Sequence, residues 1–172
     1  VFTIRGLPNG SYEAYVDGAE AYVGRIFGGP ACVGRCRDVI QTTPGTVTTV
    51  TAGSTADGVS FSLERGGRIT GVVTDTASGL PLPNVEVEVM ALVGGTVSQV
   101  DSVLTNAFGV YETRRGLATG SYIAGAFNNL GYMQELFDNV VCVDGEDCVA
   151  AVPRATPIPV SAGAATTGRN FV

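Results

Sequence analysis

The residues with the clearest chemical potential in this chain are four cysteines, which form two short pairs. Cys32 and Cys36 are separated by three residues, and Cys142 and Cys148 by five. A metal site usually holds its ligand spacing and recruits more than two ligands, so these unequal spacings favour two local disulfides over a shared site or reduced thiols. Because disulfides persist in oxidising compartments, we expect an extracellular, periplasmic or cell-surface protein.

The usual residues of catalysis are missing from this chain. It has ten arginines but no histidine and no lysine. It therefore lacks the common general base near neutral pH, a Schiff-base amine and imidazole metal ligands, and no hydroxyl has a partner that would make it a nucleophile. We expect a protein that is not an enzyme and that uses no cofactor or metal.

Acidic side chains gather around the second cysteine pair. Asp138, Asp144, Glu146 and Asp147 could offer carboxylates to Ca²⁺. The stretch lacks the alternating oxygen ligands of an EF-hand, and the loop of the first pair carries Arg35 instead. A solvated acidic loop is the favoured interpretation.

Two places are candidates for glycosylation. Asn9-Gly10-Ser11 fits the pattern of an N-glycosylation acceptor, although a plain turn is the favoured interpretation. A hydroxyl-rich stretch supplies candidate O-glycosylation sites at Thr46, Thr48, Thr49 and Thr51. Alternate threonines of a strand face solvent and could carry glycans, but threonine is also simply a good strand residue. Glycans are therefore one possible class of partner.

Composition limits the other partners. The net charge of −6 provides no basic face to neutralise phosphates, which excludes a nucleic-acid partner. No apolar run approaches the roughly 18 residues of a membrane span. With 45% hydrophobic and 15% charged residues, the chain should fold rather than stay disordered.

The strongest pattern is an internal match at an offset of 110 residues. Residues 6–12, Gly-Leu-Pro-Asn-Gly-Ser-Tyr, recur at 116–122 as Gly-Leu-Ala-Thr-Gly-Ser-Tyr. Further matches at this offset join Phe27 to Phe137, Cys32 to Cys142, and Phe61 to Phe171. We infer that residues 1–62 are the C-terminal part of one unit, whose first three strands are missing, and that residues 63–172 are a complete unit.

Six tyrosines could suggest a carbohydrate-stacking platform: Tyr12, Tyr15, Tyr22, Tyr111, Tyr122 and Tyr132. Tyr12 matches Tyr122 at the same offset, and Tyr22 matches Tyr132, which is typical of core or corner tyrosines. Since the chain also has no tryptophan, sugar binding is the weaker interpretation.

The fold class follows from strand-like alternation without helical periodicity. Short runs rich in valine and threonine, separated by Gly and Pro turns, predict an all-β protein of tandem antiparallel β-sandwich domains with seven to eight strands per unit. In the second unit, we expect strands at 68–75, 84–92, 99–105, 110–114, 120–127, 132–137, 156–161 and 169–172. In the first unit, we expect them at 2–5, 11–16, 22–27, 46–52 and 59–63.

Four motifs carry a family resemblance. They are Ile69-Thr-Gly-Val-Val-Thr-Asp75, Gly79-x-Pro-Leu-Pro-Asn-Val-x-Val87, Thr105-x-x-x-Gly-x-Tyr111 and Leu117-x-x-Gly-x-Tyr122. Together they resemble the carboxypeptidase regulatory-like domain, a prealbumin-like (transthyretin-like) β-sandwich, in the tandem form found in large bacterial surface or secreted proteins. The resemblance implies no catalytic residues. It specifies fold better than function.

The leading functional expectation is a structural repeat of an extracellular fibre, stalk or adhesin. Its partners would be neighbouring copies or repeats of itself, in a tandem array or a homopolymer assembled head-to-tail by strand complementation. The alternative is a glycan- or protein-binding accessory module of a secreted protein or peptidase.

Overall fold

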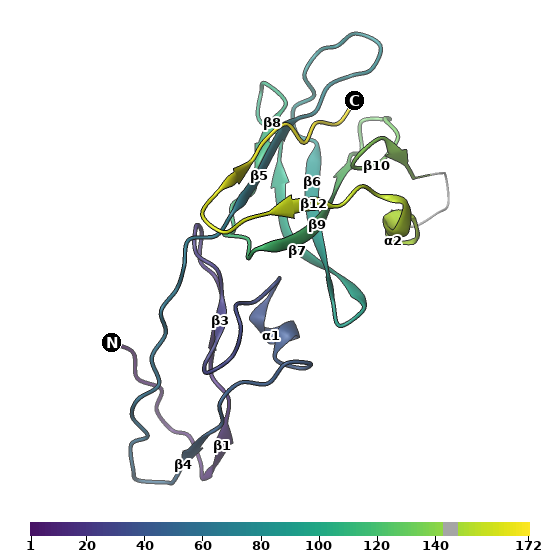
Figure 1. The fold of residues 1–172 in the computed structure, drawn as a ribbon. Helices are drawn as coiled ribbons and strands as arrows, with labels where there is room; N and C mark the ends of the chain where they lie inside the picture. The colour runs from purple at the N-terminus through teal and green to yellow at the C-terminus, as the bar shows by residue number, and fades with distance from the viewer. Residues whose placement is uncertain (143–147) are drawn as a thin grey trace.

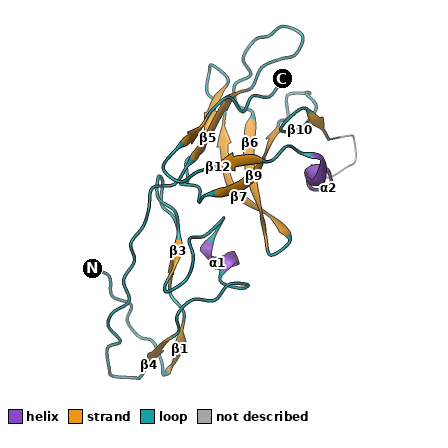
Figure 2. Ribbon diagram, in the orientation of Figure 1, coloured by secondary structure: helices purple, strands orange, loops and turns teal. Residues whose placement is uncertain are grey.

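The computed structural model describes residues 1–142 and 148–172, and its regular structure is almost entirely β (Figure 1, Figure 2). The molecule is elongated. The N-terminal segment, residues 1–62, lies at one end, and the C-terminal segment, residues 63–172, forms the larger end (Figure 1). The expectation of an all-β chain is confirmed.

Two sheets build the C-terminal segment. One contains β6 (Glu86–Val93), β7 (Thr96–Leu104), β9 (Gly120–Phe127), β10 (Glu135–Leu136), β11 (Val140–Val141) and β12 (Ile158–Val160). Its order is β11-β10-β9-β6-β7, and β12 also pairs with β9. The other has the order β13-β5-β8 and contains β5 (Arg68–Val72), β8 (Val110–Glu112) and β13 (Ala165–Thr166). The described strands pair antiparallel, except that β13 runs parallel to β5.

The main core lies between these two sheets. On β6, Val87 and Val89 are fully buried while Glu86 and Glu88 are only half-buried, as strict alternation predicts. Tyr111 of β8 reaches the same core from the smaller sheet. Burying each such side chain contributes about 1.5–3 kcal/mol, so the two sheets are held together mainly by β-branched and aromatic residues.

A β-bulge breaks the alternation of β7. It leaves Val100 without a partner of its own on β6, so that Val100 and Asp101 are both buried. The Asp101 carboxylate is held by backbone donors: Oδ2 accepts from the N–H groups of Arg114 at 2.7 Å and Arg115 at 3.0 Å, and Oδ1 accepts from that of Ser102. Asp101 thereby ties β7 to the chain that follows β8.

The N-terminal segment has shorter strands in two-stranded sheets. β1 (Gly10–Tyr12) pairs with β4 (Thr48–Val50), and β2 (Tyr15–Val16) pairs with β3 (Arg25–Ile26). A small separate core contains Ile26 and Val39 together with the first cysteine pair.

Three single-turn helices were not predicted: α1 (Cys36–Val39), α2 (Cys148–Ala151) and the 3₁₀ turn η1 (Val152–Arg154). A helix is recognised in a sequence by apolar residues that repeat with the helical period over about three turns, and a single turn is too short to show that repeat. Both α-helices begin at the second cysteine of a pair.

Several strand predictions were wrong in extent. Residues 2–5 and 59–63 form no strand, β10 covers only two of the residues expected at 132–137, and β13 was missed. At 169–172 only Phe171 bridges, to Val73. Alternation marks a residue run that fits a sheet, but a strand forms only where another strand supplies hydrogen bonds.

Asp101→Ala should lower the free energy of unfolding by about 3 kcal/mol, because backbone N–H groups lose a charged acceptor. Asp101→Asn should lose less, since its amide oxygen still accepts. Urea denaturation measures the free energy of unfolding of both variants. Leu104→Ala, at an exposed position on the same strand, is the control. Equal losses for Asp101→Ala and Leu104→Ala would contradict the role assigned to the carboxylate.

Candidate functional site: the junction between the matching segments

The residues that match at an offset of 110 also pair in the same way. β1 and β4 align with Gly10 opposite Val50, and β9 and β12 align with Gly120 opposite Val160. β2 and β3 align Tyr15 with Ile26, which corresponds to Gly125 opposite Leu136 between β9 and β10. The strand registers of the two segments are therefore identical over these pairs.

Aromatic contacts follow the same correspondence. The rings of Phe27 and Phe61 lie 6.1 Å apart, edge to face, and those of Phe137 and Phe171 lie 6.2 Å apart in the same arrangement. In each segment, the first ring follows a short strand directly: Phe27 follows β3 and Phe137 follows β10. The second ring lies near the C-terminal end of the segment. Edge-to-face pairs add stability beyond the buried area alone.

Both segments contain a tyrosine corner. The Tyr12 hydroxyl donates to the carbonyl of Pro8 at 3.0 Å, and the Tyr122 hydroxyl donates to that of Ala118 at 2.8 Å. Such a bond back to the backbone four residues upstream fixes the entry of a strand into a sheet. The burial differs, because Tyr122 is 1% exposed whereas Tyr12 is only half-buried.

The cysteine pairs lie where the sequence pattern placed them. The Cα atoms of Cys32 and Cys36 are 5.1 Å apart and those of Cys142 and Cys148 are 5.3 Å apart, and each pair is joined by a disulfide. All four cysteines are buried in small apolar clusters beside a helix. This fits an oxidising environment.

The two segments meet without a free spacer. The N–H of Val23 donates to the carbonyl of Glu64 at 3.0 Å, and the N–H of Gly66 donates to that of Ala21 at 2.8 Å. Between these bonds, the Arg65 guanidinium lies over the ring of Tyr22. The linking residues are therefore held to a loop of the N-terminal segment by a single antiparallel β-bridge, Tyr22 with Arg65.

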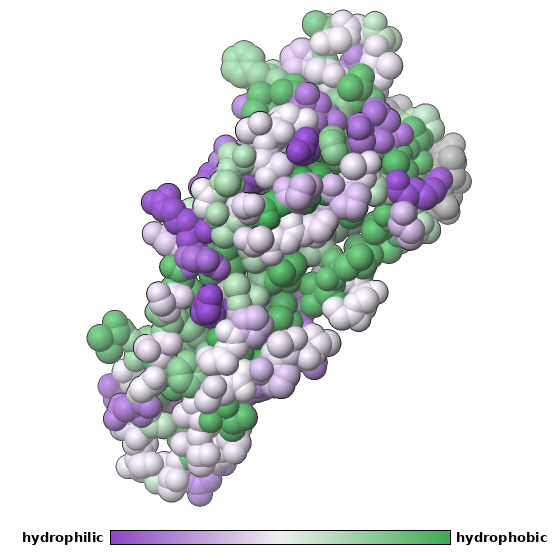
Figure 3. All heavy atoms as spheres, in the orientation of Figure 1, coloured by the Kyte–Doolittle hydropathy of each residue, from purple (hydrophilic) through white to green (hydrophobic). Residues whose placement is uncertain are grey.

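Side chains also cross the junction in both directions. Val93 at the end of β6 packs against the small core of the N-terminal segment, and Val33 in the first disulfide loop packs against the main core. A band of hydrophobic surface runs from the N-terminal segment to the β6–β7 hairpin on the face that Figure 3 shows. The junction is thus packed as well as hydrogen-bonded.

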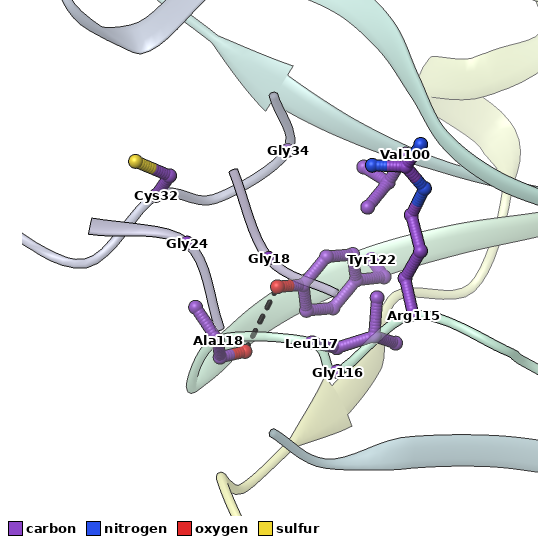
Figure 4. Close-up of a pocket in the computed structure, with 10 residues that line it drawn as sticks. All are labelled: Gly18, Gly24, Cys32, Gly34, Val100, Arg115, Gly116, Leu117, Ala118 and Tyr122. Carbon is purple, nitrogen blue, oxygen red and sulfur yellow. Dashed lines mark hydrogen bonds between the residues drawn. The ribbon is translucent and has the colours of Figure 1, made fainter. Parts of the chain in front are cut away.

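A small cavity lies at the junction. Gly24 and Gly34 of the first segment face Leu117 and Tyr122 of the second across a cavity of about 10 Å³ (Figure 4). A space of this size holds about one water molecule. Among the described residues no group of three or more cysteine or acidic side chains is arranged to hold a metal ion.

The candidate glycosylation residues lie around β1 and β4. Asn9 is exposed, and its Oδ1 accepts from the N–H of Ala52. Thr119, the residue that matches Asn9, makes the equivalent bond to Ala162 at 2.9 Å. Thr46, Thr49 and Thr51 are exposed, and Thr48 is half-buried. Asn9 therefore has a structural role, and glycosylation stays a prediction.

The remaining sequence candidates have mixed outcomes. Tyr22 and Tyr132 are each 42% exposed, so this matched pair does not belong to the core. The Tyr132 hydroxyl instead donates to the Asp75 carboxylate at 2.7 Å. In the acidic loop, Asp138 is exposed, and the other three carboxylates lie outside the described residues.

Asp75 and Asp101 were not singled out from the sequence. Asp75 closes the loop after β5, where its Oδ1 accepts from the N–H groups of Ala77 and Ser78, both at 2.7 Å. These backbone bonds and the Tyr132 hydroxyl lower the pKa of Asp75. The partners of Asp75 are two and three residues further along the chain, so its role as a turn residue could have been predicted from the sequence. Two of the partners of Asp101 are thirteen and fourteen residues away, and no sequence pattern indicates them.

Comparisons with known proteins add no family: no family model matches the chain, and a search of the curated proteins finds no match. The resemblance to the carboxypeptidase regulatory-like domain therefore rests on the sequence motifs. Within the described residues, no helix is long and apolar enough to cross a membrane.

Tyr122→Phe should lower the free energy of unfolding by about 1–3 kcal/mol, because it leaves the Ala118 carbonyl without its donor in a buried site. Tyr12→Phe should lose less, since the carbonyl of the exposed Pro8 can bond to water instead. Urea denaturation of both variants tests this. A larger loss for Tyr12→Phe would contradict the difference in burial.

A buried carboxylate makes stability depend on pH. Glu135 on β10 is 8% exposed, and its Oε1 accepts from the N–H of Val172 at 3.1 Å. Burial raises the pKa of Glu135 more than this bond lowers it, and Asp138 raises it further. A raised pKa in the folded state means that stability is lost as pH rises through that pKa.

Glu135→Gln should therefore raise the unfolding midpoint more at pH 7 than near pH 4, because the wild type loses stability as the pH rises through the raised pKa of Glu135. Thermal unfolding at both pH values measures this. Glu20→Gln at an exposed position gives the background effect. A gain at pH 4 equal to that at pH 7 would contradict the ionisation argument.

Proposed function

We propose that this chain is a structural repeat of an extracellular fibre, stalk or adhesin. Residues 1–62 would be the C-terminal part of one β-sandwich unit, and residues 63–172 a complete unit. The observation that carries the proposal is the identical strand register at an offset of 110 residues, together with a junction that has no spacer. Repeats of one fold in direct contact are typical of proteins that act by length and stiffness.

The junction supports stiffness. Domains of one chain move relative to each other unless their interface is extensive and apolar. Here the linking residues form hydrogen bonds, and Val33 and Val93 pack reciprocally across the boundary. Both kinds of contact must break before the segments can hinge.

A comparison of matched positions supports an array that continues. Val23 is 1% exposed, and its N–H donates to the carbonyl of Glu64 at the start of the C-terminal segment. Its matched residue, Met133, is 63% exposed, and Leu130 beside it is also exposed. This apolar surface is where a further unit would dock if every unit packed on the next in the same way.

The chemistry of the chain supports a location and a role of this kind. Two disulfides within short loops suit a protein that works outside the cytoplasm, where cysteines are not kept reduced. The resemblance to the carboxypeptidase regulatory-like domain in bacterial surface proteins supports the same proposal. It supplies a scaffold without catalytic residues.

Val93→Ser should loosen the junction, because it removes apolar packing against the core of the N-terminal segment. We expect ¹⁵N relaxation to show one rotational correlation time for both segments of the wild type and two for the variant. Leu92→Ser is the matched control, since the neighbouring Leu92 is 64% exposed. Two correlation times in the wild type would reject a stiff repeat.

A further inference from the structure

One face of the N-terminal segment lacks the strands that cover its counterpart. In the C-terminal segment, β6 pairs with β9 along one edge, from Glu86 opposite Phe127 to Met90 opposite Ile123. The residues that match this stretch of β9 are 13–17. Strands β1 and β2 belong to two-stranded sheets with β4 and β3, which lie on the opposite edge, where β12 and β10 pair with β9.

Side-chain burial shows the same difference. Ala124 is 0% exposed and Phe171 is 1% exposed, whereas their matched residues Ala14 and Phe61 are only half-buried. Phe2 near the start of the chain is 53% exposed. The apolar face of the N-terminal segment is therefore partly open to solvent, and a strand edge of this kind readily accepts another strand.

Other copies of this chain cannot close this face by donating the strands that cover its counterpart. Each copy has two acceptor faces, one in each segment, but only one set of strands of the β5–β7 kind. That set is already used, because β6 pairs with β7 on one edge and with β9 on the other. A strand set taken from one copy would open a face there, so exchange between copies leaves the number of open faces unchanged.

We propose that a further three-stranded segment with the pattern of β5–β7 docks on this face and leads into Val1 in the same polypeptide. This rests on the proposed repeat function and names its partner. The offset sets the register: the residue equivalent to Val87 lies opposite Val16, and the one equivalent to Val89 lies opposite Ala14. At the start of the chain, the ring of Phe2 lies 6.2 Å from that of Phe61, so the residues next to Val1 already reach this face.

The register also gives a specificity rule. On the outer face, the residue equivalent to Glu86 would lie opposite Asp17, which matches Phe127. Like charges directly opposite on neighbouring strands repel, so the docking segment should not carry an acid at this position. A basic residue there would pair with Asp17 instead.

The test fuses a second copy of residues 63–110 directly before Val1 of the full chain, because residue 111 matches residue 1. Hydrogen exchange at residues 13–17 should slow on the order of tenfold relative to the parent chain. Glu86→Arg within the added copy should slow it further. Val87→Asp within the added copy should abolish the effect, while the unaltered Val87 of the parent chain keeps the C-terminal segment folded.

Three results would overturn the proposal. One is unchanged exchange at residues 13–17 in the fusion, and another is equal protection with Val87→Asp in the added copy. The third is an associated parent chain whose residues 13–17 are already protected, which would assign the face to a second copy. Because the parent's correlation times do not depend on the added copy, failure here is distinguishable from failure of the stiff-repeat function.

Discussion

The structure depends on β6, which is paired along both edges and buried on one face. Its hydrogen bonds join β7 to β9, and Val87 and Val89 supply the centre of the main core. Where this strand is present, the corner tyrosine Tyr122 and the ring of Phe171 are buried. Where no such strand is present, the same groups in the N-terminal segment are half-exposed. One paired strand thus decides whether a set of apolar residues forms a core or an open face.

The second constraint is the direct connection between the segments. Residues 64–66 are joined to the loop at 21–23 by two backbone hydrogen bonds around one β-bridge, and the first disulfide loop packs on the C-terminal segment. A flexible linker would leave the two segments free to reorient, whereas backbone hydrogen bonds and packed valines join them here. This connection is the feature on which the proposed mechanical role rests.

Some features could be predicted because their signal is local or repeated. The alternation in β6 and the length of β9 follow from residues next to each other in the sequence, and the cysteine pairs are close in sequence. The bulge at Val100, the buried Asp101 and the single-turn helices could not be predicted in this way. Their partners lie on other elements, and one helical turn has no period to detect.

The sequence by itself determined the all-β class and the offset of 110 residues, because strand alternation and the spacing of matched residues are properties of the chain alone. Only the tertiary structure decided which matched residues are buried. Tyr22 and Tyr132 match yet stay exposed, and Phe61 matches Phe171 yet is covered less. The physical reason is that burial depends on the strands packed against a residue, and those come from distant parts of the chain.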